Sequence, residues 1–223
     1  MDQYVIALDG VSGSGKSSTA RRAAEVLDIL YLDTGAMYRT VTHLCQKNNI
    51  PPTNLHKATE FTRNLQFDVS ANGQFLVNGE DVSGLIRLPR VNEEVSDYSA
   101  IPGVREIVVD IQREIGNSRS SILEGRDIGT VVFPDAKFKF FLWASPEVRT
   151  ERRIRELQEN GILADYKEVL ANLNERDRKD SSRRHSPLTK AEDSIFIDTS
   201  HLNFEQQVRK ITDMVSRICM KTN

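Results

Sequence analysis

Short apolar runs alternate with amphipathic stretches along most of the chain. Apolar runs predict five buried strands, over residues 4–8, 29–32, 121–125, 137–144 and 194–198. Apolar positions at helical spacing predict helices over 16–27, 104–115 and 204–220. Start and stop signals predict a helix over 34–47 and two charged helices over 147–159 and 166–179. Strands that alternate with helices favour an α/β fold with a parallel five-stranded sheet flanked by helices.

One segment interrupts this alternation. Between residues 65 and 88 the apolar positions follow a period of two around Asn72-Gly73 and Asn78-Gly79, and both dipeptides are typical of tight hairpins. We therefore expect a small antiparallel sheet inserted in the parallel core. The predicted parts are a core (1–48, 102–151 and 185–223), an insert (49–101) and a lid formed by the charged helices (152–184).

Composition narrows the classes of partner. The chain has 223 residues and a net charge of -2, which gives no general attraction to nucleic acid or to a membrane surface. Every apolar run is far shorter than the roughly 20 residues of a membrane-spanning helix, and the first residues lack a basic signal sequence. Cys45 and Cys219 are far apart, so we expect reduced thiols in a cytoplasmic protein. The balanced charge favours a monomer.

A glycine-rich loop carries the strongest chemical signal. Residues 10–17, GVSGSGKS, match G-x-x-x-x-G-K-[ST] between a predicted strand and a predicted helix. Its backbone N–H groups would bind phosphates, Lys16 would reach the outer phosphates, and the Ser17 hydroxyl would ligate Mg²⁺. The predicted triphosphate site comprises Gly10, Val11, Ser12, Gly13, Ser14, Gly15, Lys16, Ser17 and Ser18. The structural alternative is a turn with a helix cap at Ser17 or Ser18.

The rest of the chain separates the classes of protein that use such a loop. The NKxD motif of GTPases is absent, and DVSG at 81–84 is better interpreted as a turn. Motor-type ATPases end an apolar strand in Asp or Asp-Glu, whereas the strand 121–125 carries only Glu124 and the strand 137–144 ends without an acid. A small-molecule kinase is therefore favoured.

A kinase needs cations that bind the acceptor, and three segments supply them. Thr34 begins a predicted helix that also carries Tyr38 and Arg39, and Arg126-Asp127 follows a buried strand. The run ERDRKDSSRR (175–184) could close over the transferred group as an arginine-rich lid. The alternatives are a helix cap at Thr34, a surface charge at Arg39, a structural ion pair at Arg126 and a solvated charged helix.

Arginines of the preceding helix leave two interpretations open. Arg152, Arg153 and Arg155 could belong to the lid, or they could pair with glutamates along their own helix.

Four motifs and the insert together resemble bacterial-type cytidylate kinases. The motifs are GxSGSGKS, DTGAMYR, EGRDIGTVVFPDA and ERDRKDSSR, in this order, and the insert contains LVNGEDVSGLIRLPRV. The resemblance covers essentially the whole chain. It implies a P-loop NTPase fold with an inserted domain that binds the nucleoside monophosphate and a helical lid. It also implies transfer of the γ-phosphoryl group of MgATP to CMP or dCMP.

The resemblance also implies roles for individual residues. Arg39, Arg126 and Arg183 would bind the CMP phosphate in a subsite lined by Thr34 and Tyr38. Lys16 and the arginines Arg126, Arg178 and Arg183 would stabilise the transition state. Arg178 would be the lid arginine nearest the phosphates, although Arg184 is an equal candidate.

Further positions match the residues that recognise the nucleoside. Ser96, Arg105 and Asp127 would recognise cytosine. Its exocyclic amine needs a hydrogen-bond acceptor, and its ring nitrogen and carbonyl need hydrogen-bond donors. Arg176 and Asp180 would hold the sugar.

Departures from the family pattern are few. Many relatives have Pro at position 11, Ala at 14 and Gly-Thr at 17–18, so either Ser17 or Ser18 could meet the metal.

A kinase for another small acceptor, such as UMP or dephospho-coenzyme A, is the alternative enzyme. A regulator that binds ATP without transferring a phosphoryl group is the alternative outside catalysis.

Overall fold

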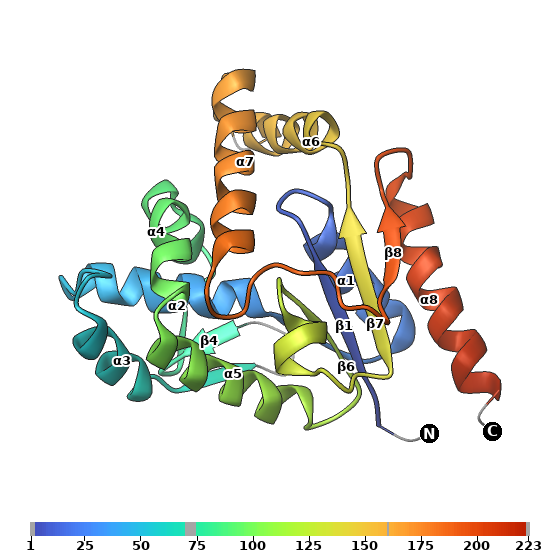
Figure 1. The fold of residues 1–223 in the computed structure, drawn as a ribbon, viewed down its shortest axis with the longest axis horizontal. Coiled ribbons are helices and arrows are strands. Elements are labelled where there is room, and N and C mark those ends of the chain that lie inside the picture. The colour runs from blue at the N-terminus through green and yellow to red at the C-terminus, as the bar shows by residue number, and fades with distance from the viewer. Residues whose placement is uncertain (1–2, 70–74, 160, 222–223) are drawn as a thin grey trace. The chain divides into compact units, whose positions relative to one another are not determined.

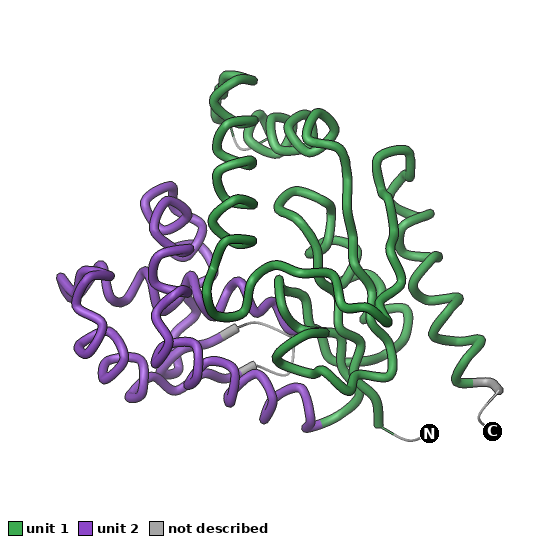
Figure 2. The backbone as a smooth tube through the Cα atoms, viewed as in Figure 1, with its two compact units in different colours: residues 1–31, 119–223 green, residues 32–118 purple. Residues whose placement is uncertain are grey.

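The computed structural model describes residues 3–69, 75–159 and 161–221. The chain forms two compact units, one made of residues 1–31 and 119–223 and the other of residues 32–118 (Figure 2). Within the described residues, no helix is both long enough and apolar enough to cross a membrane.

A five-stranded sheet organises the first unit. Its strands are β1 (Val5–Gly10), β2 (Leu30–Asp33, of which Leu30 and Tyr31 belong to this unit), β6 (Ser121–Glu124), β7 (Phe138–Trp143) and β8 (Ile195–Asp198). Their order is β2-β6-β1-β7-β8, and β1 lies at the centre between two parallel partners, β6 and β7 (Figure 1). Strand β8 pairs in parallel with β7. The helices of this unit are α1 (Lys16–Leu27), α6 (Pro146–Glu159), α7 (Tyr166–Ser182) and α8 (Phe204–Lys221).

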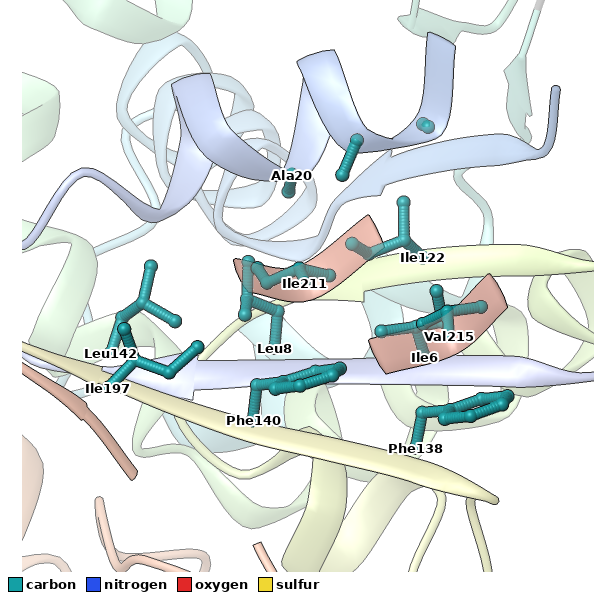
Figure 3. Close-up of a cluster of buried hydrophobic side chains, with 12 residues drawn as sticks. Ile6, Leu8, Ala20, Ile122, Phe138, Phe140, Leu142, Ile197, Ile211 and Val215 are labelled. Carbon is teal, nitrogen blue, oxygen red and sulfur yellow. The ribbon is translucent and has the colours of Figure 1, made fainter. Parts of the chain in front are cut away.

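The core of this unit lies between the sheet and two helices, α1 and α8. Ile6, Phe140 and Leu142 from the central strands pack with Ala20 of α1 and Ile211 of α8 (Figure 3). These side chains are almost completely buried. Burying strands on both faces needs nearly continuous apolar runs, and β1 and β7 show this pattern apart from Asp9 and Lys139.

Gly10 ends the central strand where only glycine fits. Its φ angle is +147°, and a Cβ at this position would lie 1.9 Å from the carbonyl oxygen of Leu142. The close approach of β7 therefore excludes a side chain at the first residue of the glycine-rich loop.

The second unit is mostly helical. It contains α2 (Thr34–Lys47), α3 (Leu55–Arg63), the 3₁₀ turn η1 (Leu85–Arg87), α4 (Pro89–Ser99) and α5 (Pro102–Gly116). A small antiparallel sheet joins β3 (Phe67–Val69), β4 (Phe75–Val77) and β5 (Glu80–Asp81) in that order. The Tyr98 hydroxyl of α4 donates to the Ile50 carbonyl at 2.6 Å, which ties the α2–α3 connection to α4.

The predicted fold class is confirmed by the parallel sheet, its flanking helices and the small antiparallel sheet. Asn78 and Gly79 both have positive φ, as the turn of a tight hairpin requires, and Asp81 accepts from the Ser83 amide in the predicted turn at DVSG. The predicted Asn72-Gly73 turn lies outside the described residues. The division into core, insert and lid stays a prediction.

Four elements were missed by the sequence analysis: α3, α4 and the short turns η1 and η2. Helix α4 has a visible signal, because Val91, Val95 and Tyr98 are buried one helical turn apart behind Pro89. Helix α3 has a weaker one, since its buried residues are only Ala58 and Thr62. The π turn η2 (Ile128–Val132) follows a strand end and has no periodic signal.

Candidate active site

The glycine-rich loop joins β1 to α1 as predicted. Gly13 and Gly15 have φ angles of +74° and +90°, and Gly15 is the residue that precedes α1. The alternative of a serine cap is wrong, because Ser18 Oγ donates to the Gly15 carbonyl and Ser17 Oγ donates to Glu124. Among the described residues, no side chain caps α1, so the amides of its first turn are available to an anion.

Lys16 lies buried over this loop. Its Nζ donates to the Val11 carbonyl at 2.6 Å and lies 3.5 Å from Ser14 Oγ. Burial first, and the Arg126 charge second, lower the pKa of Lys16 to about 7 against the raising effect of the nearby carboxylates. The lysine therefore lies where an incoming phosphate would restore its full positive charge.

Glu124 is a candidate that the sequence analysis set aside. It ends β6, and its two carboxylate oxygens accept from Ser17 Oγ at 2.9 Å and from the Tyr31 hydroxyl at 2.6 Å. The signal was an acid at the carboxyl end of a buried strand, discounted because motor-type ATPases use Asp there. The described residues contain no cluster of three or more His, Cys, Asp or Glu that could hold a metal alone. The Ser17 and Glu124 oxygens are nevertheless the hard donors that Mg²⁺ prefers when phosphates complete its shell.

Two arginines predicted to bind the acceptor phosphate, Arg126 and Arg183, meet at the carboxylate of Asp180. Its carboxylate accepts from Arg126 Nε at 2.9 Å and from Arg183 Nη2 at 2.5 Å, and the residue is 3% exposed. Burial by itself would raise the pKa of Asp180, but the charges of Arg126, Arg183 and Arg176 lower it below its ordinary value. The ion pair considered for Arg126 is therefore present, and its partner is itself a predicted site residue.

Asp127 is buried at the start of the π turn η2. The Ile128 and Gly129 amides that follow it donate to the Asp9 carboxylate at 2.8 and 2.7 Å. Burial raises the pKa of Asp9 to about 6, against the lowering effect of these two hydrogen bonds. Sequence reasoning assigned Asp9 no role.

The helices α6 and α7 reach the glycine-rich loop through residues that the sequence analysis did not assign to it. Arg149 of α6 and Asp177 of α7 bind the two backbone groups of Ser12. Arg152 donates to the Ser14 carbonyl at 3.3 Å and to the Thr199 carbonyl at 2.6 Å. Arg153, by contrast, pairs with Glu156 along its own helix.

Arg178 lies on an exposed part of α7. Its guanidinium donates to both carboxylate oxygens of Glu175, at 2.8 and 2.7 Å. Arg184 is also exposed. The choice between Arg178 and Arg184 as the lid arginine stays a prediction.

The second unit carries its own group of predicted residues. Asp33 caps α2 by accepting from the Ala36 amide at 2.8 Å, so the alternative of a cap at Thr34 is wrong. Thr34 is buried in the first turn. Arg39 is not a free surface charge, since it pairs with Asp33 at 3.0 Å, and Arg87 lies 4.0 Å from the same carboxylate.

Arg105, Tyr38 and Ser96 form a second cluster in this unit. The Arg105 guanidinium lies over the Tyr38 ring, 5.2 Å from its centroid, and donates to the Ser99 carbonyl at 3.2 Å. Ser99 Oγ in turn donates to the Ser96 carbonyl at 3.2 Å. Ser96 and Arg105 are 7% and 5% exposed, so both belong to a buried polar group within this unit.

Comparison with known proteins gives one consistent family. The cytidylate kinase family model matches residues 6–217. A cytidylate kinase of Clostridium tetani is 42% identical over 98% of this chain and 96% of its own length. That of Fusobacterium nucleatum is 43% identical over 98% of this chain and 100% of its own.

Solved structures agree on the fold. A shikimate kinase from Bacteroides thetaiotaomicron matches with a TM-score of 0.50 at 12% identity, covering 96% of this chain and 99% of that chain. A putative kinase from Chloroflexus aurantiacus matches with the same TM-score and identity. The loop, its lysine and these relatives lead to one conclusion: the chain belongs to the cytidylate kinase family.

Proposed function

We propose that this protein transfers the γ-phosphoryl group of ATP to CMP and dCMP, giving the nucleoside diphosphates. The observation that carries the proposal is the convergence of Arg126 and Arg183 on Asp180, in the same unit as Lys16. Two guanidiniums near a phosphate-binding loop are suited to an anionic acceptor, because phosphoryl transfer depends on positioning and charge neutralisation. Membership of the cytidylate kinase family supports this acceptor.

The donor half of the reaction uses the loop 10–18. Its amides and Lys16 hold the ATP phosphates, and the Ser17 hydroxyl with the Glu124 carboxylate fits Mg²⁺. When bound, Mg²⁺ neutralises the charge that develops on the phosphate oxygens. Lys16 adds a positive charge on the side of the loop.

The acceptor half uses arginines. Arg39, Arg126 and Arg183 bind the CMP phosphate, in a subsite that Thr34 and Tyr38 line. No side-chain base is required, because the attacking oxygen belongs to a phosphate that is already anionic.

The lid completes the acceptor half. Arg178 approaches the transferred group as the lid closes, which excludes water. Arg176 and Asp180 hold the sugar.

Cytosine is selected by hydrogen bonds. Ser96 and Asp127 offer oxygen acceptors to the exocyclic amine, and Arg105 offers donors to the ring nitrogen and carbonyl. Uracil has an oxygen at the exocyclic position and a proton on the ring nitrogen, so it would leave buried polar groups unsatisfied.

The proposal includes a monomer that works in the cytoplasm. It rests on the balanced charge of the sequence and on the two cysteines, both free thiols.

ADP release tests the proposal directly. The assay supplies MgATP with CMP, dCMP, UMP, AMP, GMP or no acceptor, and Lys16→Ala is the inactive control. We expect release with CMP and dCMP well above that with UMP. Equal rates of ADP release with all acceptors, or faster release with UMP, would show that CMP is not the preferred acceptor. ATP binding without acceptor-dependent ADP release would indicate a regulator.

A further inference from the structure

Asp9 is a buried carboxylate that the reaction described above does not use. It is the residue before Gly10 in the central strand β1 and is 4% exposed. Carboxylates are seldom buried to this extent unless their oxygens are bonded. Oδ1 of Asp9 accepts from the Ile128 amide at 2.8 Å, and Oδ2 accepts from the Gly129 amide at 2.7 Å.

These two bonds hold the end of a short segment that contains Arg126 and Asp127. At its other end, the Gly125 amide donates to the Leu8 carbonyl at 3.0 Å. Hydrogen bonds to two consecutive residues of β1, Leu8 and Asp9, therefore hold the chain on both sides of residues 126 and 127.

The strand that provides these attachments is itself fixed. It is hydrogen-bonded on both sides, to β6 and to β7, and Gly10 packs directly against the Leu142 backbone. A segment that is held at both ends by such a strand has little freedom to rotate.

Packing around the second bond is tight. A Cβ at Gly129 would lie 3.4 Å from Asp9 Oδ2 and 3.3 Å from Lys139 Cδ. The Asp127 side chain makes no cap bond to the π turn that it begins, so the acceptor for the first amides of that turn comes from Asp9.

We propose that Asp9 is a positioning residue for the acceptor: it holds the backbone after Asp127 so that Arg126 and Asp127 present their side chains to the nucleoside monophosphate. This inference rests on the proposed function. Both carboxylate oxygens of Asp9 are bonded to the 125–129 segment, so Asp9 acts through that segment. Its loss therefore affects acceptor binding and base choice more than ATP binding.

Asp9→Asn tests the proposal with little change in volume. The amide keeps one accepting oxygen, but its NH₂ group faces an amide donor and cannot bond to it. We expect the KM for CMP to rise roughly 10- to 100-fold, since small displacements of positioning groups have effects of this size. The preference for CMP over UMP should fall, and the KM for ATP should change less than threefold.

Asp193→Asn is the matched control. Asp193 pairs with Lys139 at 2.7 Å in the same unit, and none of its described hydrogen bonds goes to the 125–129 segment. This variant should keep the acceptor KM and the base preference of the wild type. A lower melting temperature alone, common to both variants, would indicate a structural role only.

Gly129→Ala disturbs the same contact from the opposite side and serves if Asp9→Asn does not fold. It should raise the KM for CMP in the same direction. A folded Asp9→Asn with unchanged CMP KM and CMP-to-UMP ratio would overturn the inference, as would loss of folding in both variants. Failure of the wild type to release ADP with CMP would instead overturn the proposed function.

Discussion

Arg149 and Asp177 form an ion pair of 2.5 Å that holds both backbone polar groups of Ser12. Asp177 Oδ1 accepts from the Ser12 amide at 3.0 Å, and Arg149 Nη1 donates to the Ser12 carbonyl at 2.9 Å. The two residues come from α6 and α7 (Figure 1), so both helices are attached to the same residue of the glycine-rich loop. The next residue is Gly13, where a Cβ would lie 3.3 Å from Arg149 Cβ.

Asp177→Asn should weaken ATP binding. The amide oxygen can still accept from Ser12, but Arg149 is 4% exposed and loses its charged partner. We expect a loss of about 2 kcal/mol in unfolding free energy and roughly a tenfold rise in the KM for ATP. Urea unfolding and initial rates measure the two effects.

Glu156→Gln is the control for that variant, since it removes an exposed ion pair with Arg153 on α6. Stability and ATP KM should stay at the wild-type values in this variant. The same result for Asp177→Asn would show that the contact with Ser12 has no role in the loop.

Binding of a nucleotide should bring a proton to Lys16. Burial lowers the pKa of Lys16 to about 7 in the unliganded protein, and bound phosphates raise it again. At pH 8.5 we expect uptake of up to about one proton with a non-hydrolysable ATP analogue and Mg²⁺. Calorimetry in two buffers of different ionisation enthalpy measures it.

The same lysine should make the stability of the unliganded protein depend on pH. A base whose pKa is lowered by folding binds fewer protons in the folded state, so stability rises between pH 7 and about 10. Lys16→Met should remove this rise. Equal pH profiles for the two proteins, or no proton uptake on binding, would mean that Lys16 stays charged in the empty loop.

Asp180→Asn should destabilise the protein at neutral pH. The variant leaves Arg126 and Arg183 close together without their shared carboxylate, and we expect a loss of about 3 kcal/mol. Because the folded pKa of Asp180 is lowered, its stabilisation is present above the ordinary value of 3.8 and is lost as the pH falls through the folded pKa. The difference in unfolding free energy between Asp180→Asn and the wild type should therefore decrease as the pH is lowered from about 5 to about 3. Urea unfolding across this pH range measures the difference. A difference that does not depend on pH would exclude the carboxylate charge as the origin of the stabilisation.

Ser96→Ala should lower the activity with CMP more than the activity with UMP. Ser96 is buried beside the Ser99–Arg105 contact, and removal of its hydroxyl takes away an oxygen that the cytosine amine can use. We expect kcat/KM for CMP to fall about tenfold, with a smaller change for UMP. Ser83→Ala, at an exposed turn of the same unit, is the control. An equal effect on both monophosphates would contradict a base-reading role.

The sequence by itself determined the elements that depend on neighbouring residues. The glycine-rich loop, the strands around it and the turn at Asn78-Gly79 are encoded by local apolar period and by residues that tolerate positive φ. The motif order was enough to indicate the family. Helix α4 could have been predicted from Val91, Val95 and Tyr98.

Only the tertiary structure decided which distant residues meet. Ser17 and Glu124 are 107 positions apart, Asp9 and Gly129 are 120 apart, and Ser12 and Asp177 are 165 apart. No local pattern encodes these contacts, because the sheet order places β6 and β7 on either side of β1 after long connections. The same topology buries Asp9, Lys16 and Asp180 and so sets their pKa values, which depend on the surrounding charges and solvent rather than on sequence neighbours.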